Sequence, residues 1–173
     1  MEFVISQICG IVVTVAVIIS MQLKNIKPIL ISQLIINGVG AVSYIMVGGF
    51  SGCGLYLVAV LQASIYFVFR KKDVDAPRAV DIIFILLFLG CALSTYKRPA
   101  DIITVFAAAT CALGLTQKKP FGYRICMLFN GIIWMVYDVG VGAYTMILSH
   151  FVTAAAAIIG IVRLDIKKSK VEE

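Results

Sequence analysis

The chain has 173 residues, of which 61% are hydrophobic and 14% are charged, and its mean hydropathy is +1.03. A soluble domain has about half apolar and about a quarter charged residues, so this composition excludes an ordinary soluble fold and indicates a membrane protein. The net charge of +6 does not indicate a nucleic-acid partner, because Lys and Arg come in short bursts between apolar runs, as in membrane-protein loops.

Seven apolar runs approach the ~20 residues that a helix needs to cross a bilayer. In chain order they cover residues 3–21, 28–47, 53–69, 79–95, 100–115, 121–139 and 142–162. The sequence therefore predicts an all-α membrane protein with seven transmembrane helices in a lipid bilayer. The N-terminal segment has Glu2, no basic stretch and no cleavage site, so we expect the first run to be a retained helix.

The basic residues predict the orientation of these seven spans. With the N-terminus outside, only Lys97 and Arg98 of the 15 Lys and Arg residues fall in outer segments. Cytoplasmic loops are enriched in Lys and Arg, so we expect the N-terminus outside and the C-terminus inside. The fifth run is the shortest and least apolar. If it did not span, all basic residues after it would move outside.

The chain matches itself when it is shifted by 93 residues, the separation of Asn37 and Asn130. The matched pairs are Asn37 with Asn130, Gly38 with Gly131, Tyr44 with Tyr137, Gly49 with Gly142, Leu55 with Leu148 and Arg70 with Arg163. This repeat predicts a duplicated three-helix unit, with the fourth span as a linker. Because the linker is a single helix, the second three-helix unit enters the membrane from the same side as the first. We therefore expect two parallel bundles related by a pseudo-two-fold axis along the membrane normal.

The expected parts of the chain are a first triple-helix bundle (1–72), a linker helix (73–97), a second triple-helix bundle (98–165) and a cytoplasmic tail (166–173). This 3+1+3 plan resembles the SWEET sugar-transporter and PQ-loop (MtN3-like) superfamily, although the first and fifth spans have no Pro-Gln pair.

Three stretches carry a second resemblance: "MQLKNIKPILISQLI" (21–35), "RICMLFNGIIWMVYDVGVGAY" (124–144) and "AIIGIVR" (157–163). They look like the YgjV-type family of small bacterial inner-membrane proteins. This resemblance implies a multi-pass protein of the bacterial cytoplasmic (inner) membrane, without a settled substrate. The wider superfamily implies transport by a SWEET-like fold.

Two polar stripes stand out at helical spacing, where positions i, i+4 and i+7 share one face. They are Gln33, Asn37, Ala41 and Tyr44 in the second span, and Cys126, Asn130, Trp134 and Tyr137 in the sixth. Such faces turn toward the protein interior or a wet cavity. Two interpretations stay open. The stripes line a path for a small polar solute, or the Asn residues bond neighbouring helices and the Tyr residues anchor the interface.

Two further polar residues lie within apolar spans. His150, the only histidine, is in the seventh span, and Gln62 is in the third. Both are candidate solute-binding residues, and His150 is also a candidate proton relay. The alternative for His150 is a neutral, hydrogen-bonded packing residue. Asp138 lies near the outer end of the sixth span, where we expect it to be solvated.

The chain has no catalytic, phosphate-binding or metal-binding motif, and its five cysteines include no C-x-x-C pair. We therefore expect neither an enzyme nor a cofactor or metal. The sequence predicts a facilitative, alternating-access transporter for a small polar solute, sugar-like or another metabolite. The alternative is a non-transporting membrane receptor or assembly factor of the same fold. The sequence is also compatible with a homo-oligomer.

Overall fold

The structure, a computed structural model, describes residues 2–46, 50–94, 102–141 and 144–166. Within these residues the chain forms seven α-helices and no strand. The helices are α1 (Glu2–Gln22), α2 (Ile26–Met46), α3 (Phe50–Lys71), α4 (Arg78–Ser94), α5 (Ile102–Thr116), α6 (Pro120–Val141) and α7 (Tyr144–Gly160), which continues as a π-helical segment, η2 (Ile161–Ile166). The predicted all-helical fold is confirmed, and each helix overlaps one predicted apolar run.

Three segments are long and apolar enough to cross a membrane by length and composition: Ile26–Ser43, Cys53–Lys71 and Ile147–Ile166. Two shorter apolar helices, Ile8–Gln22 and Ile102–Thr116, accompany them. The lengths and composition of these helices are therefore consistent with a multi-pass membrane protein. The full count of seven spans stays a prediction.

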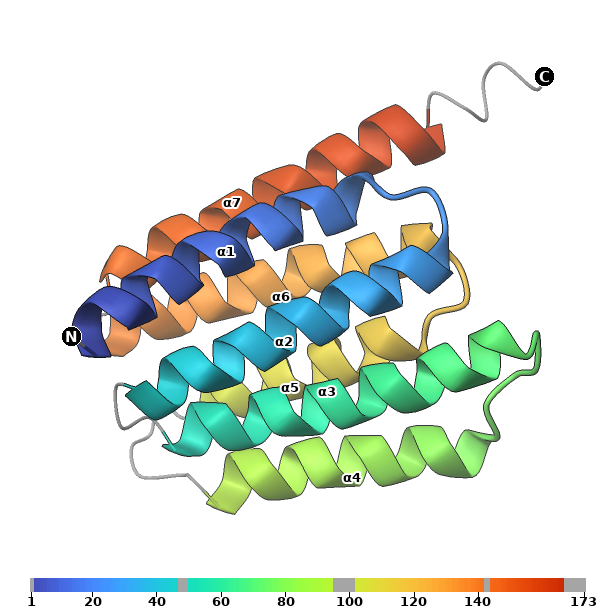
Figure 1. Ribbon diagram of the computed structural model, residues 1–173, viewed down its shortest axis with the longest axis horizontal. Coiled ribbons are helices and arrows are strands. Elements are labelled where there is room, and N and C mark those ends of the chain that lie inside the picture. The colour runs from blue at the N-terminus through green and yellow to red at the C-terminus, as the bar shows by residue number, and fades with distance from the viewer. Residues whose placement is uncertain (1, 47–49, 95–101, 142–143, 167–173) are drawn as a thin grey trace.

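The helices form a ring. Each helix packs against its neighbours in sequence, and α1 packs against α7, which closes the ring. Because α3 also contacts α5 directly, α4 lies outside the ring, against α3 and α5 (Figure 1). Successive helices run in opposite directions, so the α1–α2, α3–α4 and α5–α6 loops share one end of the molecule (Figure 1).

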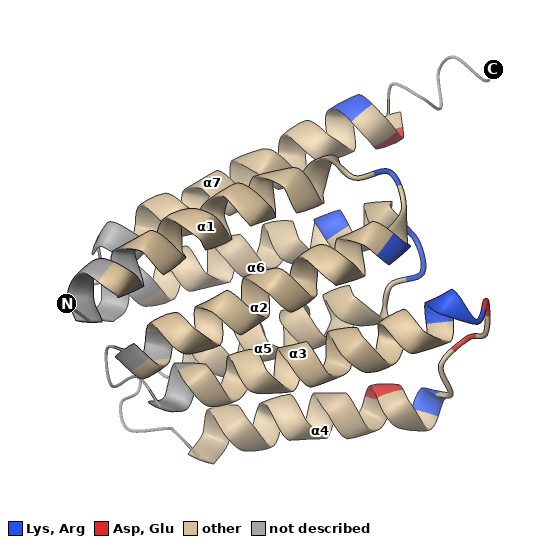
Figure 2. Cartoon of the chain, in the orientation of Figure 1, with Lys and Arg blue, Asp and Glu red and all other residues tan. Residues whose placement is uncertain are grey.

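Basic residues gather at this shared end, which we call the charged end (Figure 2). The described Lys and Arg residues are Lys24, Lys27, Arg70, Lys71, Lys72, Arg78, Lys118, Lys119, Arg124 and Arg163. The two predicted outer cations, Lys97 and Arg98, and residues 167–173 of the C-terminal tail lie outside the described residues.

Many of the buried residues are alanines, whereas many large aliphatic side chains are exposed on the outer surface. Ala63, Ala112 and Ala157 are completely buried, whereas Ile11 and Leu148 are 66% and 68% exposed. In a membrane, lipid tails are as apolar as Leu, so helices associate mainly through close packing of small residues. The exposed aliphatic side chains are therefore suited to contact lipid, while the alanines allow the helices to approach.

One ion-paired cluster joins two loops at the charged end. The Asp75 carboxylate accepts hydrogen bonds from Lys118 and from Arg70, the latter at 2.8 Å. Both bonds stabilise the charged carboxylate and so hold the pKa of Asp75 below its ordinary value. The bond from Lys118 has the larger effect and the bond from Arg70 the next largest. The α3–α4 loop is thus attached to the α5–α6 loop.

Arg124 falls in the predicted sixth run (121–139), and the structure places it in α6. Its side chain projects from α6 and is fully buried. Its Nε donates to the Met21 carbonyl at 2.8 Å, and Nη2 donates to the Leu23 carbonyl. Nη1 donates to both carboxylate oxygens of Asp165, at 2.8 and 2.6 Å. One side chain therefore joins the end of α1 to α6 and η2.

Gly160 of α7 lies against the Met21 carbonyl and the Arg124 side chain, where there is no room for a side chain. A Cβ atom there would collide with the Met21 carbonyl oxygen and would lie 3.0 Å from both Cδ and Nε of Arg124. The absence of a side chain therefore lets α7 approach α1 closely enough for the arginine to bond to both partners.

We predict that Gly160→Ala lowers the free energy of unfolding by about 1–3 kcal/mol, the usual cost of overpacking a close contact. The measurement is thermal unfolding in detergent, followed by circular dichroism. Gly90→Ala in α4 is the control, since a Cβ there meets nothing within 4 Å. Equal melting temperatures for the two variants would contradict the tight α1–α7 junction.

Candidate functional site

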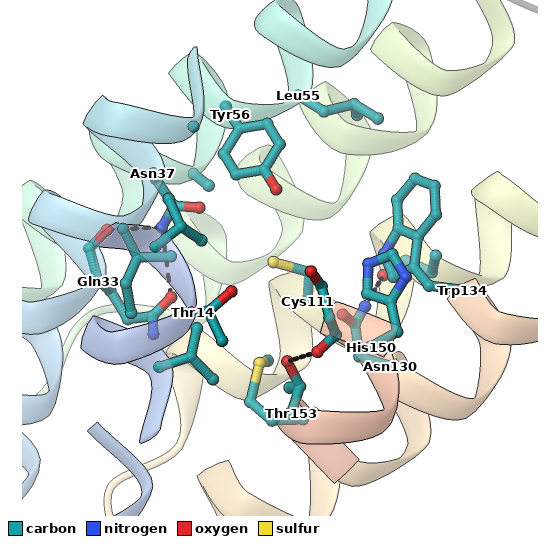
Figure 3. A pocket seen from close by; sticks show the side chains of 18 of the residues that line it. Thr14, Gln33, Asn37, Leu55, Tyr56, Cys111, Asn130, Trp134, His150 and Thr153 are labelled. Atoms are coloured by element: carbon teal, nitrogen blue, oxygen red, sulfur yellow. Dashed lines mark hydrogen bonds between the residues drawn. The ribbon is translucent and has the colours of Figure 1, made fainter. Parts of the chain in front are cut away.

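A cavity of about 200 Å³ lies inside the ring, and all seven helices contribute residues to its lining (Figure 3). An apolar cavity of ~150 Å³ can hold benzene. The cavity therefore has room for a solute somewhat larger than benzene.

The lining combines a few polar groups with apolar walls. Its amide and imidazole groups come from Gln33, Asn37, Asn130 and His150, and no Lys, Arg, Asp or Glu is among the described lining residues. A charged solute would have to lose its hydration without an opposite charge to compensate, which is costly in a low-dielectric interior. The cavity is thus better suited to an uncharged polar molecule.

Gln33 and Asn37 form one polar group on α2. Asn37 Nδ2 donates to the Gln33 backbone carbonyl at 2.7 Å and to Gln33 Oε1 at 3.3 Å. Gln33 Nε2 in turn donates to the Tyr123 hydroxyl on α6. The Asn37 Oδ1 atom points away from Gln33 and toward the cavity (Figure 3). The asparagine therefore offers the cavity an acceptor, while its donor is used within the protein.

Asn130 has different partners, although it is the repeat counterpart of Asn37. Its Nδ2 donates to the Ala107 carbonyl at 2.7 Å and to Thr110 Oγ1 at 3.0 Å. These bonds attach α6 to α5, whereas the bonds of Asn37 stay within α2. Among the described residues, Oδ1 of Asn130 has no protein partner, so its acceptor oxygen too is available.

An aromatic wall forms one side of the cavity. The rings of Trp134 and His150 stack with centroids 5.6 Å apart and planes inclined by 13°. Tyr137 meets Trp134 edge to face, with centroids 5.6 Å apart. Stacking of this kind holds the indole and imidazole rings nearly parallel against each other, and both residues line the cavity.

Gly131 allows α7 to bring His150 against Trp134. A Cβ on Gly131 would lie 3.1 Å from the His150 carbonyl oxygen and 3.5 Å from the Ala154 nitrogen, so the two backbones are in close contact. A Cβ on Gly38, its repeat counterpart, would meet nothing within 4 Å. The two Asn-Gly pairs are thus alike in sequence but not in packing.

Tyr56 of α3 lines the cavity and was not identified from the sequence. Its ring lies over Gly40 of α2, where a Cβ would be 2.7 Å from Tyr56 Cδ1. The hydroxyl points into the cavity opposite Trp134 (Figure 3). Gly40 was the available signal, because a glycine inside a helix often marks a close approach. Its partner, however, lies on another helix.

The predicted site residues divide into two groups. Gln33, Asn37, Asn130, Trp134 and His150 come together around the cavity. Gln62 lies elsewhere, fully buried, and its Nε2 donates to the Ala112 carbonyl at 3.0 Å, joining α3 to α5.

The remaining predicted residues belong to the wall or are not described. Tyr137 contacts Trp134 and is not among the lining residues. The side chains of Tyr44 and Asp138 lie outside the described residues.

We predict that Gly131→Ala lowers the melting temperature in detergent, because the new methyl group forces α6 and α7 apart, at a cost of about 1–3 kcal/mol. Gly38→Ala should leave stability unchanged or raise it by up to about 1 kcal/mol, since alanine favours a helix more than glycine does. Tryptophan fluorescence of Trp134 should shift in the first variant only. Identical behaviour of both variants would refute the packing difference.

Comparison with protein families gives one match. Residues 4–168 match the family model Imp-YgjV, described as bacterial inner membrane protein. Comparisons with curated proteins and with solved structures found no match. The match covers nearly the whole chain and confirms the YgjV-type resemblance. The likeness to SWEET and PQ-loop proteins rests on the sequence plan alone.

Proposed function

We propose that this chain, which belongs to the Imp-YgjV family of bacterial inner membrane proteins, transports a small, uncharged polar solute. The cavity carries the proposal, because polar groups of α2, α6 and α7 meet there inside otherwise apolar helices. Polar groups are expensive in hydrocarbon and tend to lie at substrate pathways. A concave, mostly apolar space with a few converging polar groups is also the usual form of a ligand site.

The amide oxygens define the kind of solute. Because Asn37 and Asn130 use their Nδ2 groups within the protein, each offers an acceptor to the cavity. The solute therefore supplies hydroxyl or N–H donors. The stacked Trp134 and His150 offer a flat face for an apolar side of the same molecule.

The transporter would have two parallel three-helix bundles, α1–α3 and α5–α7, joined by α4. The starts of the helices support this arrangement. The separations of α2 from α6 and of α3 from α7 are both 94 residues (120 − 26 and 144 − 50), within one residue of the sequence shift. The position of α4 outside the ring agrees with a linker role. Rocking of the bundles about the cavity would give alternating access.

The orientation has the N-terminus outside and the C-terminus inside. The clustering of described basic residues at the charged end supports it, because cytoplasmic loops are rich in Lys and Arg. The default mechanism is facilitated diffusion, since no coupling motif is recognised in the sequence.

The first test identifies a solute by thermal shift of the detergent-solubilised protein against uncharged polyols, sugars and amides, followed by flux into proteoliposomes. We predict that Asn37→Ala reduces this flux about tenfold, the effect of losing one hydrogen bond of ~1.4 kcal/mol. Asn37 is preferred to Asn130, whose amide also attaches α6 to α5.

Ser64→Ala is the matched control. Ser64 Oγ donates to the Val60 carbonyl four residues earlier, as Asn37 does to Gln33, but Ser64 is not among the lining residues of the cavity. Its flux should equal that of the wild type. Unchanged flux through Asn37→Ala would refute the site, and binding without flux for every solute would favour a receptor instead of a transporter.

A further inference from the structure

Two polar layers bond helices together between the cavity and the charged end. In the first layer the Gln33 side chain of α2 bonds to the Tyr123 hydroxyl of α6. Tyr123 is fully buried and lines the cavity together with Met21. The layer therefore joins the two sides of the ring directly at the cavity floor.

Arg124, the next residue in sequence, forms the second layer. It bonds to the carbonyls of Met21 and Leu23, at the end of α1. Met21 thus lines the cavity and also accepts a bond from the arginine at its backbone oxygen. Two further bonds reinforce the same end, from Gln22 Nε2 to the Ala156 carbonyl at 3.3 Å and from Arg70 Nη2 to the Thr116 carbonyl at 3.4 Å.

The partners of Arg124 are divided between the two proposed bundles. Asp165 follows α7, in the same bundle as Arg124, whereas Met21 and Leu23 belong to the other bundle. If the bundles separate at the charged end, Arg124 loses its two carbonyl partners but keeps its carboxylate. The guanidinium charge is therefore compensated in both conformations, which avoids the high cost of an unpaired buried charge.

We propose that Arg124 is a latch that closes the charged end of the cavity, with Asp165 as its permanent counter-ion and the Gln33–Tyr123 bond as a second closure. The latch depends on the proposed transport function, because alternating access requires this end to open and close. When the charged end opens, Arg124 gives up its bonds to the carbonyls of Met21 and Leu23, and water hydrates these neutral carbonyls instead.

A native thiol allows a test that needs no solute. Cys111 lines the cavity, and its sulfur points into it (Figure 3). In a protein with the other four cysteines changed to Ala, labelling of Cys111 by the membrane-impermeant reagent 2-sulfonatoethyl methanethiosulfonate reports access to the cavity. Separate assays of right-side-out and inverted vesicles test each end. Lys72→Cys in a chain without Cys111 identifies the preparation that exposes the charged end.

Arg124→Gln should raise the rate of Cys111 labelling from the charged end about tenfold or more, which corresponds to a shift of ~1.4 kcal/mol in the closing equilibrium. Tyr123→Phe removes a single hydroxyl from the first layer and should give a smaller increase at the same end. Size-exclusion chromatography and circular dichroism show whether Arg124→Gln folds. If it does not, the Cys111 labelling rate of Tyr123→Phe tests the proposal in its place.

Arg163→Gln is the control, because it removes an exposed cation from η2, the segment that carries Asp165. Its labelling rate should equal that of the unmodified background. The latch is refuted if folded Arg124→Gln and Tyr123→Phe label at the background rate, if Arg163→Gln gains as much, or if the gain occurs at the opposite end. Absence of solute flux would refute the transport proposal without altering these labelling rates.

Discussion

Inside an apolar helix bundle, a guanidinium group is tolerable only if the protein itself compensates its charge and bonds most of its N–H groups. Arg124 meets this requirement with two carbonyls and one carboxylate drawn from α1 and η2. The same bonds fix the position of α1 against α6 and α7. The contact of α1 with α7 and the glycine at that contact are therefore both tied to the bonds of one side chain.

The amides obey the same requirement with a different result. Each asparagine places its donor on a protein oxygen, which fixes the orientation of its side-chain amide. The acceptor oxygen then stays with the cavity. The structural and solute-binding interpretations of Asn37 and Asn130 are therefore not exclusive, because the nitrogen already bonds within the protein and the proposed solute would bind the oxygen. A helical membrane protein of this size can build a polar site without dedicating whole residues to it.

The sequence was sufficient for features that depend on one helix at a time. Apolar run length located the helices, and the spacing of Gln33 and Asn37 placed both on the cavity side. Features that depend on two helices escaped it. Arg124 falls in the predicted sixth span and Asp165 stands among basic residues 41 positions later, so no sequence pattern linked the two. The difference between Gly38 and Gly131 arises only from the backbone that faces each one.

The bond between α1 and Arg124 also bears on how the protein is made. Carbonyls at the end of a helix have no partner within that helix, and 103 residues separate Met21 from the arginine that binds it. At ~5–20 residues per second, ribosomal synthesis takes about 5–20 s to cover that interval. Throughout that time the end of α1 relies on water or on the insertion machinery, so α1 takes its final place only after α6 has been synthesised.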